Sequence, residues 1–220
     1  MGVDVVFFDI GGVIYDDAVY ERAVLLGLRD LGAEVTDEEY AAAYDELRRA
    51  QAGSFRDTLA DRFLPEPVDR DTVTEHVSRY WANEPEALLP DVRPCLEALR
   101  DAGYLLAVVA NQPSEVREAM ERDQLDAFFS WMGISDDLGL EKPDPRIFAH
   151  AVETIGAEPG HCAMVGDRLD YDVRAAKAAG MRAVWVLRGE APSDPTPEQL
   201  AEPDAAVRSL AELPEALERL

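Results

Sequence analysis

Asp9 is the only charged residue in the apolar stretch VVFFDIGGVIY, and Gly11 and Gly12 follow it closely. Asp167 follows a second largely apolar run, HCAMVG, and Asp172 stands five residues further on. Two carboxylates that meet at strand ends repel each other unless a cation lies between them. Oxygen-only ligands suit Mg²⁺, so the pattern predicts a magnesium site built from these aspartates.

Two more polar residues are expected near these acids. Asn111 ends the apolar run YLLAVVA, and Lys142, one of two lysines in the chain, lies in the segment GLEKPDPRIF. Open parallel sheets bind ligands outside the carboxyl ends of their strands, where these groups would converge. Taken singly, each residue could be a solvated acid, a helix cap or a surface lysine. Taken together, they favour a functional site.

The elements that would position these groups change character along the chain. Residues 16–88 contain only helical patterns, whereas strand and helix signals alternate after residue 89, as in parallel sheets with crossover helices. The segment 191–199 is rich in turn residues. The expected strands are 4–9, 104–110, 128–135, 161–166 and 182–187. The expected helices are 17–31, 37–51, 53–63, 70–82, 92–102, 114–123, 145–156, 170–179 and 209–219.

Three segments resemble the motifs of the haloacid dehalogenase-like (HAD) superfamily, most of whose members are phosphatases: FFDIGGV, GLEKPDPRIF and MVGDRLDYD. Their order and spacing fit over nearly the whole chain. The resemblance implies an α/β fold with a Rossmann-like parallel-sheet core, formed by residues 1–15 and 89–220. It also implies an inserted all-helical cap domain, residues 16–88, which would cover the site and select the substrate.

The resemblance also implies roles for single residues. Asp9 would attack phosphorus and form an aspartyl-phosphate. Its carboxylate would hold Mg²⁺ together with the backbone carbonyl of Gly11 and the side chain of Asp167, with Asp172 in or near the metal shell. Lys142 would bind the substrate and neutralise charge on the transferring group.

Glycine at positions 11 and 12 would let the backbone approach the metal and the phosphate, so Gly12 is expected to contact the substrate.

Two positions depart from the usual family pattern. Gly11 stands where a second aspartate usually protonates the leaving group, and Ala110 stands where a Ser or Thr usually binds phosphate. Loss of general acid–base catalysis costs roughly 10²–10⁴-fold, so a weakened enzyme that prefers good leaving groups is expected. The amide of Asn111 could replace the missing hydroxyl. Another acid near the start of the cap could reach the leaving group, and the candidates are Tyr15, Asp16 and Asp17.

Two other functions stay open at this stage. A catalytically weak or dead relative could bind a phosphorylated ligand or a protein partner, which the two departures would allow. A metal-independent haloacid dehalogenase would also lack the second aspartate, but it would have no use for the pair Asp167 and Asp172. No motif in the sequence indicates the substrate beyond a small phosphorylated metabolite, or an oligomeric state.

The composition and net charge of the chain restrict its expected partners and cellular compartment. The 220 residues carry a formal net charge of −24, with two lysines among 21 basic residues. Such a field disfavours nucleic acid and anionic membranes, and the chain has neither a signal sequence nor an apolar run of membrane-spanning length. We therefore predict a cytoplasmic protein without nucleic-acid or membrane partners. The acidic excess suggests a salt-loving host, and Cys95 and Cys162 are expected to be reduced core thiols.

Overall fold

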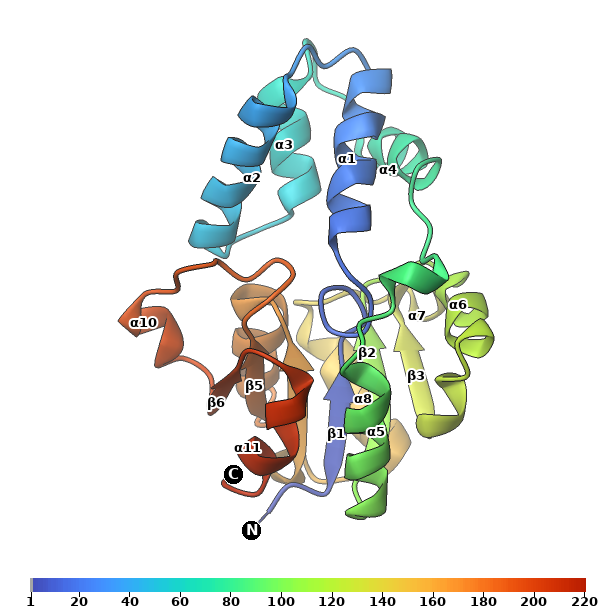
Figure 1. Cartoon of the computed structure of the whole chain (residues 1–220), viewed down its shortest axis with the longest axis vertical. Helices are drawn as coiled ribbons and strands as arrows, with labels where there is room; N and C mark the ends of the chain where they lie inside the picture. Colours follow the sequence, from blue (N-terminus) through green and yellow to red (C-terminus); the bar gives the residue numbers. More distant parts are fainter. Residues whose placement is uncertain (1) are drawn as a thin grey trace.

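The computed structural model describes residues 2–220 and contains a single sheet of six parallel strands (Figure 1). Their order across the sheet is β3-β2-β1-β4-β5-β6, the order of a Rossmann-like fold. The predicted α/β core is therefore confirmed. The strands are β1 (Val5–Phe8), β2 (Leu105–Ala110), β3 (Trp131–Ile134), β4 (Cys162–Gly166), β5 (Arg182–Val186) and β6 (Ala205–Val207).

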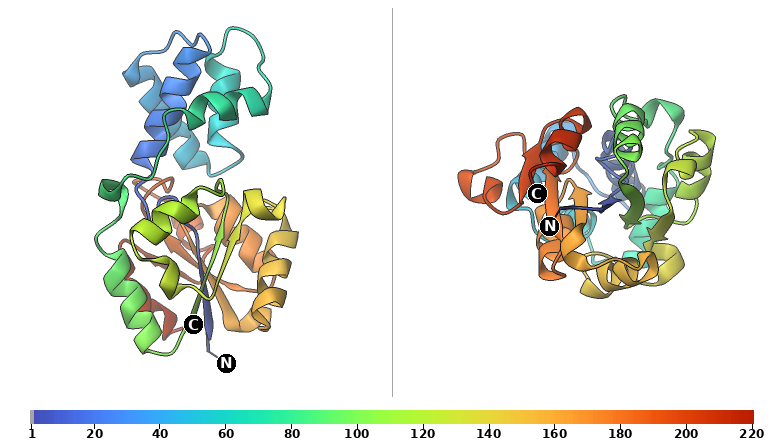
Figure 2. Two further views of the ribbon diagram at one scale, coloured as in Figure 1. Left: turned by 90° about the vertical axis from the view of Figure 1, so that its right-hand side faces the viewer. Right: turned by 90° about the horizontal axis from the view of Figure 1, so that it is seen from below.

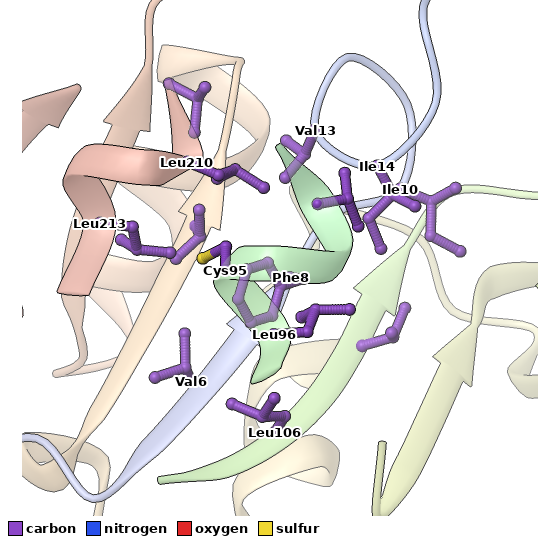
Figure 3. Packing of buried hydrophobic residues seen from close by; sticks show 14 of the residues in the cluster. Val6, Phe8, Ile10, Val13, Ile14, Cys95, Leu96, Leu106, Leu210 and Leu213 are labelled. Carbon is purple, nitrogen blue, oxygen red and sulfur yellow. The ribbon is translucent and has the colours of Figure 1, made fainter. Parts of the chain in front are cut away.

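Strand β1 is buried along its whole length, which explains its unbroken apolar sequence. Side chains alternate between the two faces of a strand, so Phe8 packs into one hydrophobic cluster and Phe7 into another. Figure 3 shows Phe8 beside Cys95 and Leu96 in the first of these clusters. Layers of helices on both faces thus hold the central strand in place.

Each face of the sheet has its own set of helices (Figure 2). Those that contribute to the cluster around Phe8 are α5 (Val92–Asp101), α6 (Val116–Arg122) and α11 (Leu213–Leu217), the last preceded by η5 (Leu210–Glu212). Those that contribute to the cluster around Phe7 are α8 (Pro145–Ile155), η4 (Leu169–Arg174) and α9 (Ala175–Ala178). Short helical segments complete the core: η2 (Asp126–Phe128), α7 (Ser135–Leu138), η3 (Pro159–His161) and α10 (Pro197–Leu200).

Four helices inserted after β1 form the helical cap, which lies beyond the carboxyl ends of the strands (Figure 1). They have a separate hydrophobic core that includes Leu28, Tyr44 and Leu59. A capping box between Thr36 and Glu39 fixes the start of the second helix. The cap helices are α1 (Ala18–Asp30), α2 (Asp37–Ala50), α3 (Phe55–Phe63) and α4 (Arg70–Ser78), followed by η1 (Pro85–Ala87).

The two chain segments that join cap and core run side by side. Tyr15 and Leu88 form an antiparallel bridge, and the backbone N–H of Leu89 donates to the carbonyl of Ile14 at 3.0 Å. These contacts tie the entrance and the exit of the cap together beside the loop that follows β1. The orientation of the cap is therefore set close to the ends of the central strands.

Several short elements differ from the sequence predictions. Strand β6 and helices α7 and α10 were not predicted, because three or four residues are too few to show a period. The strand expected at 128–135 is limited to Trp131–Ile134, since residues 126–128 form a 3₁₀ turn. The helix expected at 170–179 begins as a π-helix. No described helix combines the length and apolarity needed to cross a membrane.

Candidate active site

A cavity of about 680 Å³ lies between the cap and the carboxyl edge of the sheet. Core residues Asp9, Lys142 and Asp167 line it on one side, and Arg56 and Trp81 line it from the cap. Both parts of the protein therefore contribute to one site. A molecule bound there would touch side chains that are far apart in the sequence.

Strand order explains why two of the predicted acids meet. Strands β2 and β3 lie on one side of β1, and strands β4, β5 and β6 lie on the other. The direction in which strands are added to the sheet therefore changes between β1 and β4. Asp9 follows β1 and Asp167 follows β4, and the N–H of Asp9 donates to the carbonyl of Val165 at 2.9 Å. Such a switch point is the usual place for a ligand in an open α/β sheet.

Asp9, Asp167 and Asp172 each offer a carboxylate oxygen, and these atoms lie within 4.8 Å of one another. Desolvation raises the pKa of Asp9 to about 6, against the opposing effect of Lys142. Burial and the nearby charge of Asp17 raise the pKa of Asp167 well above its usual range. Buried carboxylates at such distances gain from a cation between them, and three oxygen donors fit Mg²⁺.

Lys142 lies in the floor of the cavity and is almost completely buried. Its Nζ is 3.0 Å from Oδ1 of Asp9 and donates to Oδ1 of Asp172 at 2.6 Å. Burial alone would lower the pKa of Lys142, but the two aspartates outweigh burial and raise it. The lysine is therefore a permanent positive charge beside Asp9.

Asn111 is tied to the main chain of Lys142. Its Nδ2 donates to the carbonyl of Lys142 at 2.8 Å, and its Oδ1 accepts from the N–H of Lys142 at 2.7 Å. The side chain thus holds the lysine loop against the end of β2. One N–H of the amide is left for another acceptor, so the predicted contact with phosphate stays a prediction.

Gly12 occupies a position that only glycine fits. Its φ is +62°, and a Cβ there would lie 2.3 Å from Oδ2 of Asp167 and 2.6 Å from Oδ2 of Asp17. Its carbonyl accepts from Nε of Arg188 at 2.9 Å. A neighbouring Cβ at Gly11 would lie 2.7 Å from Oδ1 of Asp17. Both glycines therefore leave space for carboxylates in the floor of the cavity.

All three candidate acids near the cap entrance line the cavity, but only one of them lies against the two glycines that follow Asp9. The hydroxyl of Tyr15 donates to Asp123 at 2.8 Å, and Asp16 is exposed and accepts from the N–H of Ala18. Asp17 lies beside Gly11, in the cavity. The sequence alone could not distinguish these three residues, because the direction of each side chain depends on the turn that precedes α1.

The loop after β5 contributes contacts that the sequence did not indicate. The backbone N–H of Glu190 donates to Oδ2 of Asp167 at 2.6 Å, and the side chain of Glu190 accepts from Arg168 at 2.6 Å. Fully buried Gln51, from the cap, accepts from the N–H of Leu169 and donates to the carbonyl of Glu190. These residues join the cap to both loops beside Asp167. The contacts of Gln51 span more than a hundred residues and those of Glu190 more than twenty, so no local pattern could reveal them.

The parallel sheet and the inserted helical cap define this protein as a Rossmann-like α/β protein, with an acidic cluster at the switch point of its sheet. A family model described as haloacid dehalogenase-like hydrolase matches residues 3–180. The chain belongs to this family and is a hydrolase, which confirms the predicted membership.

Named relatives agree with this assignment. The chain is 37% identical to a phosphoserine phosphatase of Thermus thermophilus over 76% of its own length and 67% of the relative's. It is 32% identical to a glyceraldehyde 3-phosphate phosphatase of Methanopyrus kandleri over 86% and 85%. Among solved structures, a HAD phosphatase from Thermococcus onnurineus is 30% identical, covers 98% of both chains and gives a TM-score of 0.64.

Proposed function

We propose that this protein is a Mg²⁺-dependent phosphatase that hydrolyses a small phosphorylated metabolite through an aspartyl-phosphate on Asp9. The observation that carries the proposal is the meeting of Asp9, Asp167, Lys142 and the buried Asp172 at the cavity between cap and core, which the first three of them line. Relatives named as phosphatases support the reaction class. The core would be residues 1–15 and 89–220, and the cap residues 16–88.

In the first step an oxygen of Asp9 would bond to phosphorus while the bond from phosphorus to the ester oxygen breaks. Lys142 would hold a non-bridging oxygen of the phosphoryl group, because its charge lies 3.0 Å from Asp9. In the second step water would attack the same phosphorus and release inorganic phosphate and free Asp9. Mg²⁺ would be held by Asp9, Asp167 and the Gly11 carbonyl, with Asp172 nearby. It would reduce repulsion between carboxylate and phosphate.

Gly12 and Asn111 would position the substrate. The left-handed backbone at Gly12 permits close approach, and Asn111 keeps the lysine loop in register with β2. The cap would exclude water from the phosphoryl group during transfer and choose the rest of the substrate. Its side chains at the cavity include Arg56 and Trp81, so the distal part of the substrate would meet one cationic and one aromatic group.

A substrate panel tests the proposal. Purified protein is assayed against phosphorylated metabolites that include phosphoserine and glyceraldehyde 3-phosphate, with Mg²⁺ or with EDTA and in low and high KCl. We expect release of inorganic phosphate only with Mg²⁺. Tight binding of a phosphorylated compound without turnover would instead support the catalytically inactive alternative. Chloride release from a haloacid in EDTA would support the dehalogenase alternative.

The cellular setting is proposed from composition alone. A net charge of −24 suits a cytoplasm rich in salt, and the two buried free cysteines suit a reducing compartment. The negative field would not exclude an anionic substrate, since Lys142 and the metal supply positive charge inside the cavity.

A further inference from the structure

The oxygens of the proposed metal site come from two separate loops. Asp9 and the carbonyl of Gly11 belong to the loop after β1, and Asp167 belongs to the loop after β4. Pairing of the two strands ends at Phe8 and Val165, and the N–H of Asp9 adds one hydrogen bond beyond it. Mg²⁺ demands oxygens at nearly fixed positions. The spacing of the two loops beyond the sheet therefore needs its own support.

The loop after β1 is a compact turn that an arginine holds from outside. The carbonyl of Ile10 accepts from the N–H groups of residues 13–15 at 3.3, 2.8 and 3.0 Å. Arg188, in the loop after β5, donates from Nε to the carbonyl of Gly12 at 2.9 Å and from Nη2 to that of Val13. A guanidinium carries its donors in one rigid plane. One side chain thus fixes two successive peptide groups of this turn.

Arg188 is itself firmly held. Its Nη1 donates to both carboxylate oxygens of Asp91, at 2.9 and 2.8 Å. Oδ2 of Asp91 also accepts from Oγ of Ser209 and from the N–H of Leu210, both at 2.8 Å. The backbone turns back at this point, because the N–H of Ala191 donates to the carbonyl of Arg188 at 3.0 Å. All three guanidinium nitrogens are therefore bonded to parts of the core.

The two residues after Arg188 reach Asp167. The N–H of Glu190 donates to Oδ2 of Asp167 at 2.6 Å. Gly189 has a φ of +60°, and a Cβ there would lie 2.3 Å from Oδ2 of Asp167 and 2.6 Å from Cα of Gly12. Gly189 thus lies between the two loops and is in close contact with both. Residues 188–190, which we call the β5 turn, therefore connect the loop of Asp9 to Asp167.

We propose that the β5 turn sets the spacing between the loop of Asp9 and the side chain of Asp167. Arg188 and Gly189 are positioning residues in this account, since they act through the backbone of Gly12 and through Asp167. The proposal rests on the phosphatase function proposed above. It adds to that function the elements that hold the proposed metal ligands in place.

An ordinary structural ion pair between Arg188 and Asp91 would behave differently. Lysine at position 188 would keep a positive charge for Asp91, but its single nitrogen cannot also hold two carbonyls as the guanidinium does. Loss of a positive charge near a cation site would by itself strengthen Mg²⁺ binding. Loss of positioning would weaken it. The two roles of Arg188 therefore predict opposite signs for the change in Mg²⁺ affinity.

The test uses the full-length protein and three variants, Arg188→Lys, Arg188→Met and Gly189→Ala. Arg182→Met is the arginine control, because Arg182 begins β5, is exposed and pairs with Asp204 at 3.6 Å. Gly156→Ala is the glycine control. Its φ of +74° gives similar backbone strain, but no heavy atom of the described residues lies within 4 Å of its Cβ point.

Two readouts are combined. Calorimetry measures Mg²⁺ affinity, and hydrogen exchange in EDTA measures the protection of the N–H groups of residues 13–15, which are bonded to Ile10. Circular dichroism establishes that each variant is folded. If Arg188→Met fails to fold, Arg188→Lys decides the outcome.

We expect all three variants to bind Mg²⁺ about 10–100-fold more weakly than wild type, as is usual when a partner of a metal ligand is lost. Residues 13–15 should exchange faster in both Arg188 variants, and the two controls should match wild type. Wild-type Mg²⁺ affinity in Arg188→Lys would overturn the proposal. Tighter binding by Arg188→Met, or equal affinity in Gly189→Ala and Gly156→Ala, would overturn it too.

Failure of the underlying phosphatase proposal would look different. In that case the wild-type protein would bind no Mg²⁺ and release no phosphate. The exchange measurement needs no metal, so faster exchange of residues 13–15 in both Arg188 variants would still support the role of the β5 turn. Wild-type exchange in both variants would overturn it.

Discussion

Lys142 and Asp172 form a buried ion pair beneath the cavity, with Nζ 2.6 Å from Oδ1. Their side chains are 1% and 0% exposed. The second oxygen of Asp172 accepts from the N–H of Arg168 at 3.0 Å, so the pair also holds the loop that follows Asp167. One contact therefore links the positive charge beside Asp9 to the position of the loop that follows Asp167.

Lys142→Met should be costly for this reason. The change leaves Asp9 and Asp172 buried without their common partner, and breaking a buried pair costs about 3–5 kcal/mol. We expect the free energy of unfolding in urea and EDTA to fall by about that much, with part of the loss recovered when Mg²⁺ replaces the missing positive charge. Arg146→Met, on an exposed pair, is the control. A change below about 1 kcal/mol would contradict the structural account.

Asp167→Asn should change thermal stability and Mg²⁺ affinity in opposite directions. Desolvation and the charge of Asp17 make a carboxylate at this position unfavourable in the metal-free protein. We expect the variant to unfold at a higher temperature than wild type in EDTA and yet to bind Mg²⁺ more weakly by calorimetry. Asp172→Ala should weaken Mg²⁺ binding less, and exposed Asp101→Ala should change nothing. Unchanged affinity in Asp167→Asn would place the metal elsewhere.

Salt should stabilise the whole molecule. If every one of the 21 basic residues is paired with an acid, 24 acidic charges are still unbalanced and repel each other. The screening length falls from about 30 Å at 0.01 M to about 3 Å at 1 M salt. The melting temperature should therefore rise from dilute buffer to molar KCl, although surface ion pairs weaken. A melting temperature that falls steadily with KCl would remove the proposal of a salt-loving host.

The two thiols should be inert in the native protein. Burial raises the pKa of Cys95 to about 12 and that of Cys162 to about 11. At pH 8 the reactive thiolate is then about one part in a thousand or less. We expect almost no reaction with Ellman's reagent until urea unfolds the chain. The pKa values of the two thiols are higher in the folded than in the unfolded protein. The stability that the buried neutral thiols contribute is therefore present below about pH 9 and is lost at higher pH. Rapid labelling of native protein at pH 8 would show that the core opens around these residues.

The sequence predicted the parts of the fold and of the candidate site that depend on local patterns. Asp9 and Asp167 could be placed at strand ends because short apolar runs precede them, and parallel strands bring those ends to one edge. Lys142 could be added because lysine is rare in this chain. Strand β6 escaped prediction, since its three residues pair only with β5 at the margin of the sheet.

Contacts made across the cap could not be predicted. Asp16 and Asp17 look equivalent in the sequence, but one is exposed and the other lies beside Gly11. Gln51 accepts a hydrogen bond from the N–H of Leu169, and no pattern in either segment predicts this contact. The hydrogen bonds of Asn111 to the main chain of Lys142 were also not foreseen, and its contact with phosphate stays a prediction. Each of these facts depends on how two distant segments dock, and docking is decided by packing.

Trapping the covalent intermediate tests the central claim most directly. Enzyme is mixed with Mg²⁺ and a substrate that carries radiolabelled phosphate, quenched in acid within milliseconds, digested and mapped by mass spectrometry. The account predicts label on the peptide that contains Asp9, loss of the label in base, and no label in Asp9→Asn, which should be folded but inactive. Phosphate release by wild type with no labelled peptide, or substantial Mg²⁺-dependent turnover by Asp9→Asn, would contradict it.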